Sequence, residues 1–385
     1  MLFTNKLACS IAIAVSVCSF NAQSITVEEE RIQKAIKVMP SVSLALSDRV
    51  NLFKEQVNKA RNLTVLSQLS IRHGKGVWND AKQYFKNTNS YDDRPLYWAR
   101  LQMSKALKDT KAFKESLPDQ QNKLLWHFEL YSRGQTDIKF DKNTSKKILI
   151  TGFDPFLLDR NIKQSNPSGI SALVLDDLVI STEGKSAEIE TLILPVRFAD
   201  FDQGIVEELL TPYFRANAVD MIITVSMGRN SFELERFPGL RRSSLVPDNL
   251  NVLTGATKDN PLIPMLNDKK LSGPEYLEFT LPSEQMKNAG GLYPVQDNRI
   301  VTTKNTTLEV QALTELINEI SVQGSGGGYL SNEVSYRSLL LRDLYSPVLP
   351  VGHIHTPSIK EHDDNKLELI VTQLKGMLTQ ALKTL

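Results

Sequence analysis

The hydrophobic positions along the chain follow two different patterns, and the change lies at about residue 146. Before it, apolar residues recur at helical spacing in the segments 47–66, 95–107 and 124–131, and strand-like runs are scarce. Acidic residues open a first segment at 27–30, which is typical of a helix N-terminus. Between these segments, residues 73–76 (HGKG) predict a turn. We therefore predict a mainly helical region over residues 25–145.

After residue 146, compact apolar runs alternate with amphipathic segments. The runs predict strands at 147–153, 188–196, 219–225 and 348–355, and the amphipathic segments predict helices at 166–178, 201–214, 308–320 and 366–385. Strands that alternate with helices need crossover connections, which indicates an α/β domain with a mostly parallel sheet over residues 146–385. Residues 229–304 are irregular and rich in turns, and an insertion of this kind often shapes a site.

Composition and charge narrow the classes of partner. The chain has 385 residues, 41% of them apolar, so a sizeable core is expected. Its 45 basic residues nearly cancel its 44 acidic ones, and the formal charge of +1 gives no reason to expect a nucleic-acid partner. After the N-terminus no apolar run is long enough for a membrane span.

The first residues resemble an export signal. Lys6 precedes an apolar stretch at 7–20 that is too short to cross a bilayer, and the segment 22–24 (AQS) has small residues at the spacing of a cleavage site. We therefore predict a signal peptide at 1–24 and an exported protein that is periplasmic or secreted. A retained N-terminal anchor and a lipoprotein processed at Cys18 are the alternatives.

Cysteine usage agrees with export. The two cysteines, Cys9 and Cys18, both lie inside the predicted signal. The mature chain would then have no disulfide, no thiolate metal site and no cysteine nucleophile. A chain without thiols suits an oxidising compartment such as a periplasm.

A glycine-rich turn at 326–328 leads directly into a helical pattern that begins near Ser331. Free backbone N–H groups gather at such a helix start and favour negative charge. Ser331 is therefore well placed to be a nucleophile whose oxyanion is stabilised there. It could equally be an ordinary helix cap, since serine is common at that position.

Two further polar residues join Ser331 near the predicted strand ends, where open parallel sheets bind ligands. Glu235, Ser331 and His355 have the identities of an acid, a nucleophile and a base. Each also has a plainer interpretation. Glu235 could form a surface ion pair with Arg236, and His355 could be an ordinary hydrogen-bonded histidine or one half of a metal pair with His353.

Several short segments, in order over residues 146–360, resemble the pyroglutamyl peptidase I family. They are 150–156 (ITGFDPF), 166–168 (NPS), 194–198 (LPVRF), 228–229 (GR) with 235–236 (ER), 247–249 (PDN), 281–282 (LP), 327–332 (GGYLSN) and 352–357 (GHIHTP). The resemblance implies a three-layer αβα sandwich with a mostly parallel, mixed sheet. It also implies a peptidase that removes N-terminal pyroglutamate from peptides without a metal or an organic cofactor. The helical region and the export signal have no counterpart in the family pattern.

The resemblance also assigns roles to individual residues. Glu235 and His355 match the catalytic glutamate and histidine, and Ser331 stands where the family has its cysteine nucleophile. Phe153 and Phe156 match the aromatic residues that hold the lactam ring. The remaining substrate contacts that the resemblance implies are Met227, Gly228, Arg229 and Tyr329.

The sequence departs from the family at the nucleophile and in a shortened loop at 226–229. A serine cannot form a thiolate, so Ser331 would have to lose its proton during attack to a neutral His355 oriented by Glu235. Three functions remain open: a serine-dependent pyroglutamyl peptidase, a non-catalytic protein that binds the same peptides, and an esterase or amidase on the same fold. The helical region could dock a partner, cover the site or replace oligomer contacts, and no pattern specifies an oligomeric state.

Overall fold

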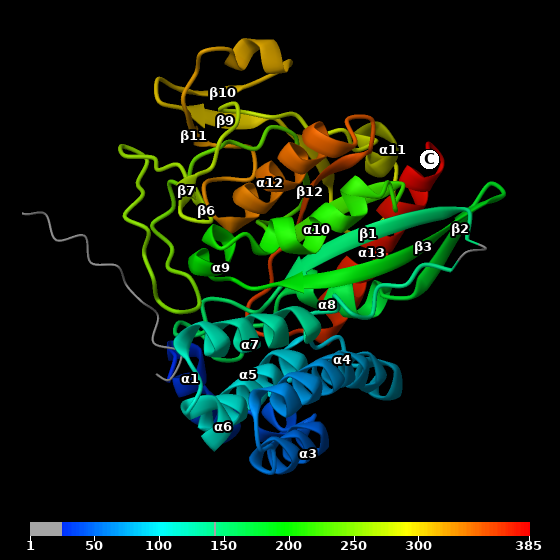
Figure 1. Cartoon of the computed structure of the whole chain (residues 1–385). Helices are drawn as coiled ribbons and strands as arrows, with labels where there is room; N and C mark the ends of the chain where they lie inside the picture. Colours follow the sequence, from blue (N-terminus) through cyan, green and yellow to red (C-terminus); the bar gives the residue numbers. More distant parts are fainter. Residues whose placement is uncertain (1–24, 142–143) are drawn as a thin grey trace, which may run out of the picture.

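The computed structural model describes residues 25–141 and 144–385, so the predicted signal peptide at 1–24 lies outside the described residues. The chain begins with a bundle of helices and continues into an α/β domain (Figure 1). The helices of the first part are α1 (Val27–Val38), α2 (Pro40–Ser43), α3 (Ser47–Asn58), α4 (Leu63–Thr88), α5 (Arg94–Asp109), α6 (Lys111–Lys114) and α7 (Pro118–Tyr131). Within the two described ranges, no helix is both long and apolar enough to cross a bilayer.

Local sequence signals explain where these helices begin. The α1 helix starts at a capping box in which the Thr26 hydroxyl accepts from the Glu29 backbone N–H and the Glu29 carboxylate accepts from that of Thr26. Pro95 lies in the first turn of α5, as its fixed φ favours. The predicted helical region is therefore present.

The predicted turn at 73–76 is wrong, because these residues lie in the middle of α4. Gly74 lies where α4 packs closely against α7. A Cβ at Gly74 would lie 2.8 Å from the Cβ of Tyr131 at the end of α7, so the glycine allows the two helices to approach closely. The apparent turn signal thus marks a helix–helix contact.

The α/β domain contains a seven-stranded sheet with the order β2-β3-β1-β4-β12-β5-β8. The neighbours β3, β1, β4 and β12 run parallel, β5 and β8 are parallel to each other, and β2 and β5 pair antiparallel with β3 and β12. The strands are β1 (Lys146–Phe153), β2 (Leu178–Thr182), β3 (Lys185–Leu194), β4 (Met221–Met227), β5 (Phe232–Glu235), β8 (Val295–Asn298) and β12 (Val351–Thr356). The mostly parallel, mixed sheet is confirmed.

Helices cover both faces of this sheet, which completes three layers (Figure 1). One layer contains α8 (Pro167–Leu175) and α13 (Asp364–Leu382), which pack against each other and against β1, β2 and β3. The other contains α10 (Ile205–Arg215) and α12 (Leu330–Tyr345), with the short α9 (Phe198–Asp202) beside α10. The short α11 (Ser283–Lys287) packs on α13 and β8. The predicted αβα sandwich is confirmed.

Two predicted helices differ from the structure. The helix expected at 166–178 ends at Leu175, and β2 follows as an antiparallel edge strand paired with β3. The helix expected at 308–320 is wrong, because that segment belongs to a small lobe of β9 (Ile300–Thr303), β10 (Thr307–Glu309), the 3₁₀ helix η1 (Leu313–Leu316) and β11 (Ser321–Gln323). The apolar residues that suggested a helix instead fill a satellite core with Phe237 and Tyr276. A two-stranded ribbon of β6 (Met265–Leu266) and β7 (Lys269–Lys270) completes the irregular stretch.

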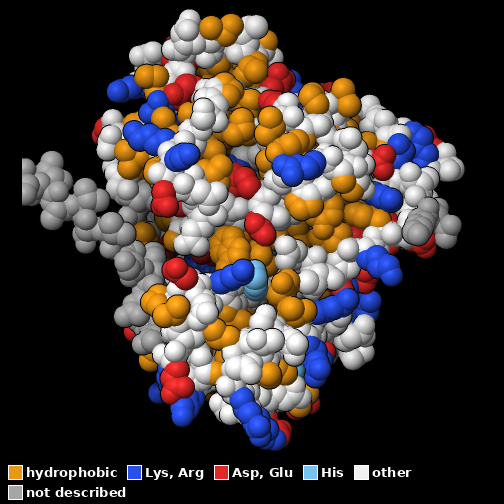
Figure 2. Space-filling model, in the orientation of Figure 1, with side chains coloured by type: hydrophobic (Ala, Val, Ile, Leu, Met, Phe, Trp, Pro, Cys, Tyr) orange, Lys and Arg blue, Asp and Glu red, His pale blue; other side chains and the backbone are white. Residues whose placement is uncertain are grey.

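Side chains of every class reach the surface of the molecule, and the view in Figure 2 shows no large field of a single charge sign. Basic and acidic groups are interspersed on this face, as the near-zero formal charge of +1 leads one to expect. This face therefore agrees with the absence of an electrostatic signal for nucleic acid in the sequence.

Glu190 gives the sheet a pH-dependent stability. Its side chain on β3 is 1% exposed, one carboxyl oxygen has no hydrogen-bond partner, and burial together with Asp176 raises its pKa to about 8. The folded protein therefore binds more protons than the unfolded chain between pH 4.5, the ordinary pKa of a glutamate, and about pH 8, so this group's contribution to stability falls as pH rises through that window. Glu190→Gln, which imitates the neutral acid, is expected to raise the free energy of unfolding at pH 8.5 by roughly 1–3 kcal/mol and to change it little at pH 4.5.

Urea unfolding of both proteins at the two pH values measures this difference. Glu188→Gln removes the same charge from a half-buried position on the same strand and is the matched control. An equal stability gain for Glu190→Gln at both pH values would show that Glu190 does not titrate in this window.

Candidate active site

A small pocket opens at the carboxyl ends of the parallel strands β1 and β4. Phe153 is the last residue of β1 and Met227 the last of β4, so the sheet places both side chains at the same edge. The pocket has an empty volume of about 300 Å³, counting its open mouth. It is lined by Phe153, Phe156, Asn166, Val196, Ser226, Met227, Tyr329, Leu330 and Ser331. Four of the predicted substrate contacts and the predicted nucleophile therefore share one cavity.

Ser331 lies in the first turn of α12, where the glycine turn enters the helix. The helix begins at Leu330 and its N-cap residue is Tyr329, which makes no side-chain cap. The interpretation of Ser331 as a helix cap is therefore wrong. Its hydroxyl is half-buried and donates to the carbonyl of Gly326 at 3.2 Å.

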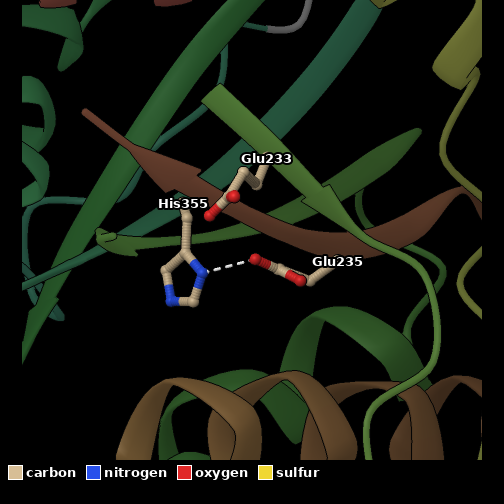
Figure 3. A group of neighbouring side chains, drawn as sticks. All are labelled: Glu233, Glu235 and His355. Atoms are coloured by element: carbon tan, nitrogen blue, oxygen red, sulfur yellow. Dashed lines mark hydrogen bonds and ion pairs between the residues drawn. The ribbon is translucent and has the colours of Figure 1, made fainter. Parts of the chain in front are cut away.

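Glu235 and His355 form a buried pair on adjacent strands (Figure 3). Glu235 is the last residue of β5, a short strand after β4 that pairs antiparallel with β12. Its Oε1 lies 2.5 Å from Nδ1 of His355, and its Oε2 accepts from the Asn298 amide at 2.8 Å. Burial raises the pKa of Glu235, and His355 opposes that rise. Because the carboxylate holds Nδ1–H, the other ring nitrogen is left as the proton acceptor.

The glycine turn joins Ser331 to this pair. A Cβ at Gly326 would lie 3.6 Å from Cγ of Glu235, while the Gly326 carbonyl accepts from Ser331. On the other side, His355 lies opposite Ser226 in the β4–β12 register, and Ser226 lines the pocket. Across the described ranges, no hydrogen bond joins Ser331 to His355.

Gly228 and Arg229 lie beside the pair rather than in the pocket lining. A Cβ at Gly228 would lie 2.5 Å from Cβ of His355, so a glycine is needed for β12 to approach this loop. The Arg229 guanidinium is 67% exposed and binds the Glu233 carboxylate at 2.7 Å. Gly228 therefore packs against His355, and Arg229 binds Glu233 beside it.

The ion pair expected between Glu235 and Arg236 is wrong. The Arg236 guanidinium binds Asp297 at 2.6 Å and Glu278 at 3.3 Å. Arg236 directly follows the last residue of β5, and successive side chains of an extended segment point to opposite sides, so Arg236 does not share the environment of Glu235. The Glu235 carboxylate is therefore hydrogen-bonded to His355 and Asn298 instead.

His353 is a structural histidine. Its Nδ1 is 2.8 Å from the Thr224 hydroxyl and its Nε2 is 2.8 Å from the Ser226 hydroxyl. Burial, followed by the nearby His355, lowers the pKa of His353 well below its usual value. Both nitrogens are engaged, so this geometry does not support the metal pair with His355.

Ligand atoms of Glu233, Glu235 and His355 lie within 4.8 Å of one another (Figure 3). All three groups already have partners, because Arg229 binds Glu233 and Glu235 binds His355. The arrangement is that of a hydrogen-bonded acid–base pair next to an ion pair between the buried Glu233 carboxylate and the exposed Arg229 side chain. The absence of a metal or organic cofactor stays a prediction.

Sequence reasoning missed several residues of this site. Asn166, Val196 and Leu330 line the pocket, and each lies inside a segment that carries the family resemblance. Asn298, which holds the second oxygen of Glu235, comes from the end of β8. No local sequence signal marks Asn298, because its role depends on the pairing of β8 with β5.

The chain is similar to two described protein domains. The domain described as "PA0049 N-terminal domain" matches residues 11–129, and "PA0049, C-terminal domain" matches residues 147–267 and 294–360. A protein of Pseudomonas aeruginosa named "Uncharacterized protein PA0049" is 27% identical over an alignment that covers 77% of this chain and 70% of that protein.

Solved structures of pyroglutamyl peptidase I, also called pyrrolidone carboxyl peptidase, are among the structural neighbours, each covering 62% of this chain. The enzyme of Pyrococcus furiosus is 23% identical over 99% of its chain with a TM-score of 0.43. That of Thermococcus litoralis is 20% identical over 94% of its chain with a TM-score of 0.42. That of Bacillus amyloliquefaciens is 21% identical over 98% of its chain, also with a TM-score of 0.42.

Proposed function

We propose that this protein is an exported hydrolase that removes N-terminal pyroglutamate from peptides, with Ser331 as its nucleophile. The observation that carries the proposal is the buried pair of Glu235 and His355, whose glycine-turn neighbour Gly326 also contacts Ser331. Ser331 lines the pocket, and Gly326 links it to the Glu235–His355 pair, which lies next to the pocket lining. The motifs at 150–156, 327–332 and 352–357 support the same activity by resemblance.

The reaction proceeds through an acyl-enzyme. Nε2 of His355 takes the Ser331 proton as Oγ attacks the carbonyl between pyroglutamate and the next residue. The imidazolium then gives that proton to the leaving amine, and the C–N bond breaks. Water, deprotonated by the same imidazole, hydrolyses the ester and restores Ser331. Glu235 holds Nδ1–H throughout and stabilises the imidazolium.

The start of α12 supplies the electrostatic part of catalysis. Backbone N–H groups of the first turn have no intrahelical acceptor, and the helix dipole adds positive potential there. The oxyanion of the tetrahedral intermediate forms next to Ser331 and is stabilised by these groups. For attack, the Ser331 hydroxyl rotates away from the Gly326 carbonyl toward His355.

The pocket suits a small uncharged ring. Phe153, Phe156 and Val196 give it apolar walls, and the pocket is small. A five-membered lactam is flat and uncharged, so it loses little solvation on entering such a slot. A free N-terminal amine would have to be desolvated without a carboxylate among the lining residues.

A second candidate is a protein that binds pyroglutamyl peptides without cleaving them. The hydrogen bond from Ser331 to the Gly326 carbonyl favours it, because the hydroxyl proton is directed to a group that is not a base. Both candidates use the same pocket and differ only in whether bond cleavage follows binding.

Purified mature protein should be tested with a chromogenic pyroglutamyl amide and a simple ester, together with Ser331→Ala, Ser331→Cys and Ser338→Ala. The serine mechanism predicts turnover of the amide by the native protein and by Ser338→Ala, a buried serine on the same helix. Ser331→Ala should lower kcat/KM by about 10³-fold or more.

The other outcomes separate the alternatives. Pyroglutamate binding without turnover, with activity appearing only in Ser331→Cys, would overturn the serine mechanism in favour of the binding protein. Turnover of esters but not of pyroglutamyl amides would assign the site to an esterase.

A further inference from the structure

We infer that the helical region is a fixed clamp on the wall of the pocket, and that Asp93, Arg100 and Arg31 are positioning residues for substrate binding. The inference rests on the proposed function only where it concerns pyroglutamyl substrates. Its physical basis is the loop at 154–166, here called the wall loop, which joins β1 to α8 and contributes Phe156 and Asn166 to the pocket. Side chains of the helical region bind this loop at its start, its outer part and its end.

Asp93 binds the end of the wall loop. It is the N-cap residue of α5, yet its side chain caps nothing in its own helix. Instead its buried carboxylate accepts from the Ser165 hydroxyl and from the backbone N–H of Asn166 at 3.1 Å. The Asn166 amide in turn donates to the carbonyl of Asp154 at 2.9 Å. The carboxylate at the N-cap position of α5 thus holds the pocket residue Asn166 in place instead of capping its own helix.

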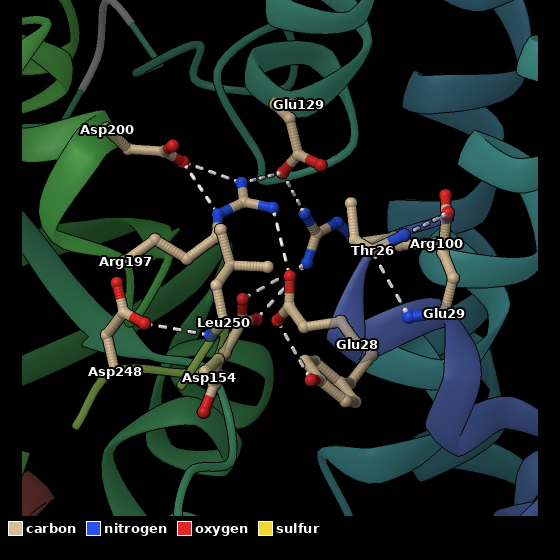
Figure 4. Close-up of polar contacts among 12 residues, drawn as sticks. Thr26, Glu28, Glu29, Arg100, Glu129, Asp154, Arg197, Asp200, Asp248 and Leu250 are labelled. Atoms are coloured by element: carbon tan, nitrogen blue, oxygen red, sulfur yellow. Dashed lines mark hydrogen bonds and ion pairs between the residues drawn. The ribbon is translucent and has the colours of Figure 1, made fainter. Parts of the chain in front are cut away.

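Arg100 and Arg133 bind the start of the wall loop. Asp154 directly follows Phe153, and one of its oxygens lies 3.2 Å from the Arg100 guanidinium (Figure 4). Its other oxygen lies 2.8 Å from the Arg133 guanidinium. Both arginines also bind Glu129 of α7. Although burial acts to raise it, the surrounding arginines hold the pKa of Glu129 well below its usual range. Every charge here is buried and paired.

A second segment that lines the pocket, at Val196, is joined to the same network through its neighbour Arg197 (Figure 4). Arg197 follows the lining residue Val196 and binds Glu28 of α1 at 3.1 Å and Glu129 at 2.9 Å. Separating the helices from the α/β domain would leave buried carboxylates and guanidinium groups without partners. The interface is therefore a permanent one, which argues against a movable cover over the site.

Arg31 of α1 reaches the wall loop at its outer edge. It binds the Asp159 carboxylate at 2.7 Å and the carbonyl of Asn249 at 2.5 Å, and the Asn249 amide donates to the carbonyl of Pro155. Apolar packing adds to these bonds. Leu158 and Ile162 of the loop share a buried cluster with residues of α1 and α5, namely Ile32, Ala35, Tyr97, Trp98 and Leu101.

The test uses full-length mature protein with Asp93→Ala, Asp93→Asn and the control Asp48→Ala, an exposed aspartate near the start of α3. In Asp93→Ala we expect amide exchange across the wall loop to accelerate about tenfold, with the strands β1 and β4 unchanged. The KM for a pyroglutamyl amide should rise about tenfold while kcat changes less than about threefold, because the ring loses its wall but the acid–base pair is intact. Asp93→Asn retains an acceptor oxygen, so its wall-loop exchange rate and its KM should stay close to those of the native protein.

Unchanged wall-loop exchange in Asp93→Ala would overturn the clamp, as would an acceleration spread evenly over the whole chain. If Asp93→Ala does not fold, Arg31→Ala provides the same comparison, since its partner Asp159 is 52% exposed and tolerates the loss. Exchange needs no substrate. A native protein without turnover would therefore refute the proposed function while the exchange result still decides the clamp.

Discussion

His355→Ala is expected to lower kcat/KM for a pyroglutamyl amide by about 10³–10⁴-fold with little change in KM. A serine hydroxyl is too weak an acid to ionise by itself, so losing the imidazole removes both the acceptor for the Ser331 proton and the donor to the leaving amine. His355 lies near the end of β12, at the pocket edge of the sheet, and its Nδ1 is bound to Glu235. Steady-state kinetics of the two purified proteins measure the effect.

The carboxylate partner supplies the control for this prediction. Glu235→Gln keeps the shape of the side chain, but its amide can donate to Nδ1 and so move the ring proton to Nε2, the atom that must accept from Ser331. An effect on kcat of about 10²–10⁴-fold is expected. Glu233→Gln changes a neighbouring carboxylate that binds Arg229 and should change kcat less than about threefold. Equal losses for the two glutamine variants would contradict the orienting role of Glu235.

The fold could be predicted from the sequence where a segment's environment follows from its own pattern. The segments that form β1 and β4 are buried on both faces of the sheet. Their unbroken apolar runs therefore predict buried strands without information about the strands beside them. The same reasoning failed at 308–320, where the apolar residues are shared among the end of β10, η1 and the irregular segments beside them. The spacing of these apolar residues resembles that of a helix. Their burial is explained by the satellite core around Phe237, which the local sequence does not reveal.

The candidate site was predictable in part for a similar reason. Ser331 follows a glycine turn and His355 lies near the end of a strand, and both signals are local. Glu235 was a candidate because it follows a predicted strand, and the resemblance gave it the catalytic role, but its place on β5 depends on antiparallel pairing with β12. The contribution of Asp93 lies beyond sequence reasoning, because it contacts Asn166 from a different structural region.

For the helical region, the sequence predicts the helices but not their contacts with the α/β domain. Its pattern predicted helices, and those helices are present. The residues that bind the α/β domain, such as Arg100 and Arg133, are charged and occur in or beside helices whose sequences are those of ordinary amphipathic segments. Only their burial against Asp154 distinguishes them from solvated surface charges. The domain boundary near residue 145 remains a prediction.

Gly152→Ala is expected to lower the free energy of unfolding by about 3 kcal/mol or more. Gly152 lies in β1 in register with Ile193, and α8 crosses directly over it. A Cβ at this position would lie 2.2 Å from the Ser168 carbonyl oxygen and 2.7 Å from its carbon. Both atoms belong to the backbone of the first turn of α8, so no side-chain rotation can relieve the overlap. Urea unfolding of the variant and the native protein measures the loss.

Gly290→Ala is the matched control, because no atom lies within 4 Å of the added methyl group, and it should change stability by less than about 0.5 kcal/mol. The Gly152 overlap also bears on the pocket. The Ser168 hydroxyl accepts from the backbone N–H of Phe153 at 3.1 Å, so a displaced α8 releases the residue that begins the pocket wall. A folded Gly152→Ala protein should therefore bind pyroglutamyl substrate more weakly, whereas native-like stability and native-like binding together would show that α8 does not hold β1 in this way.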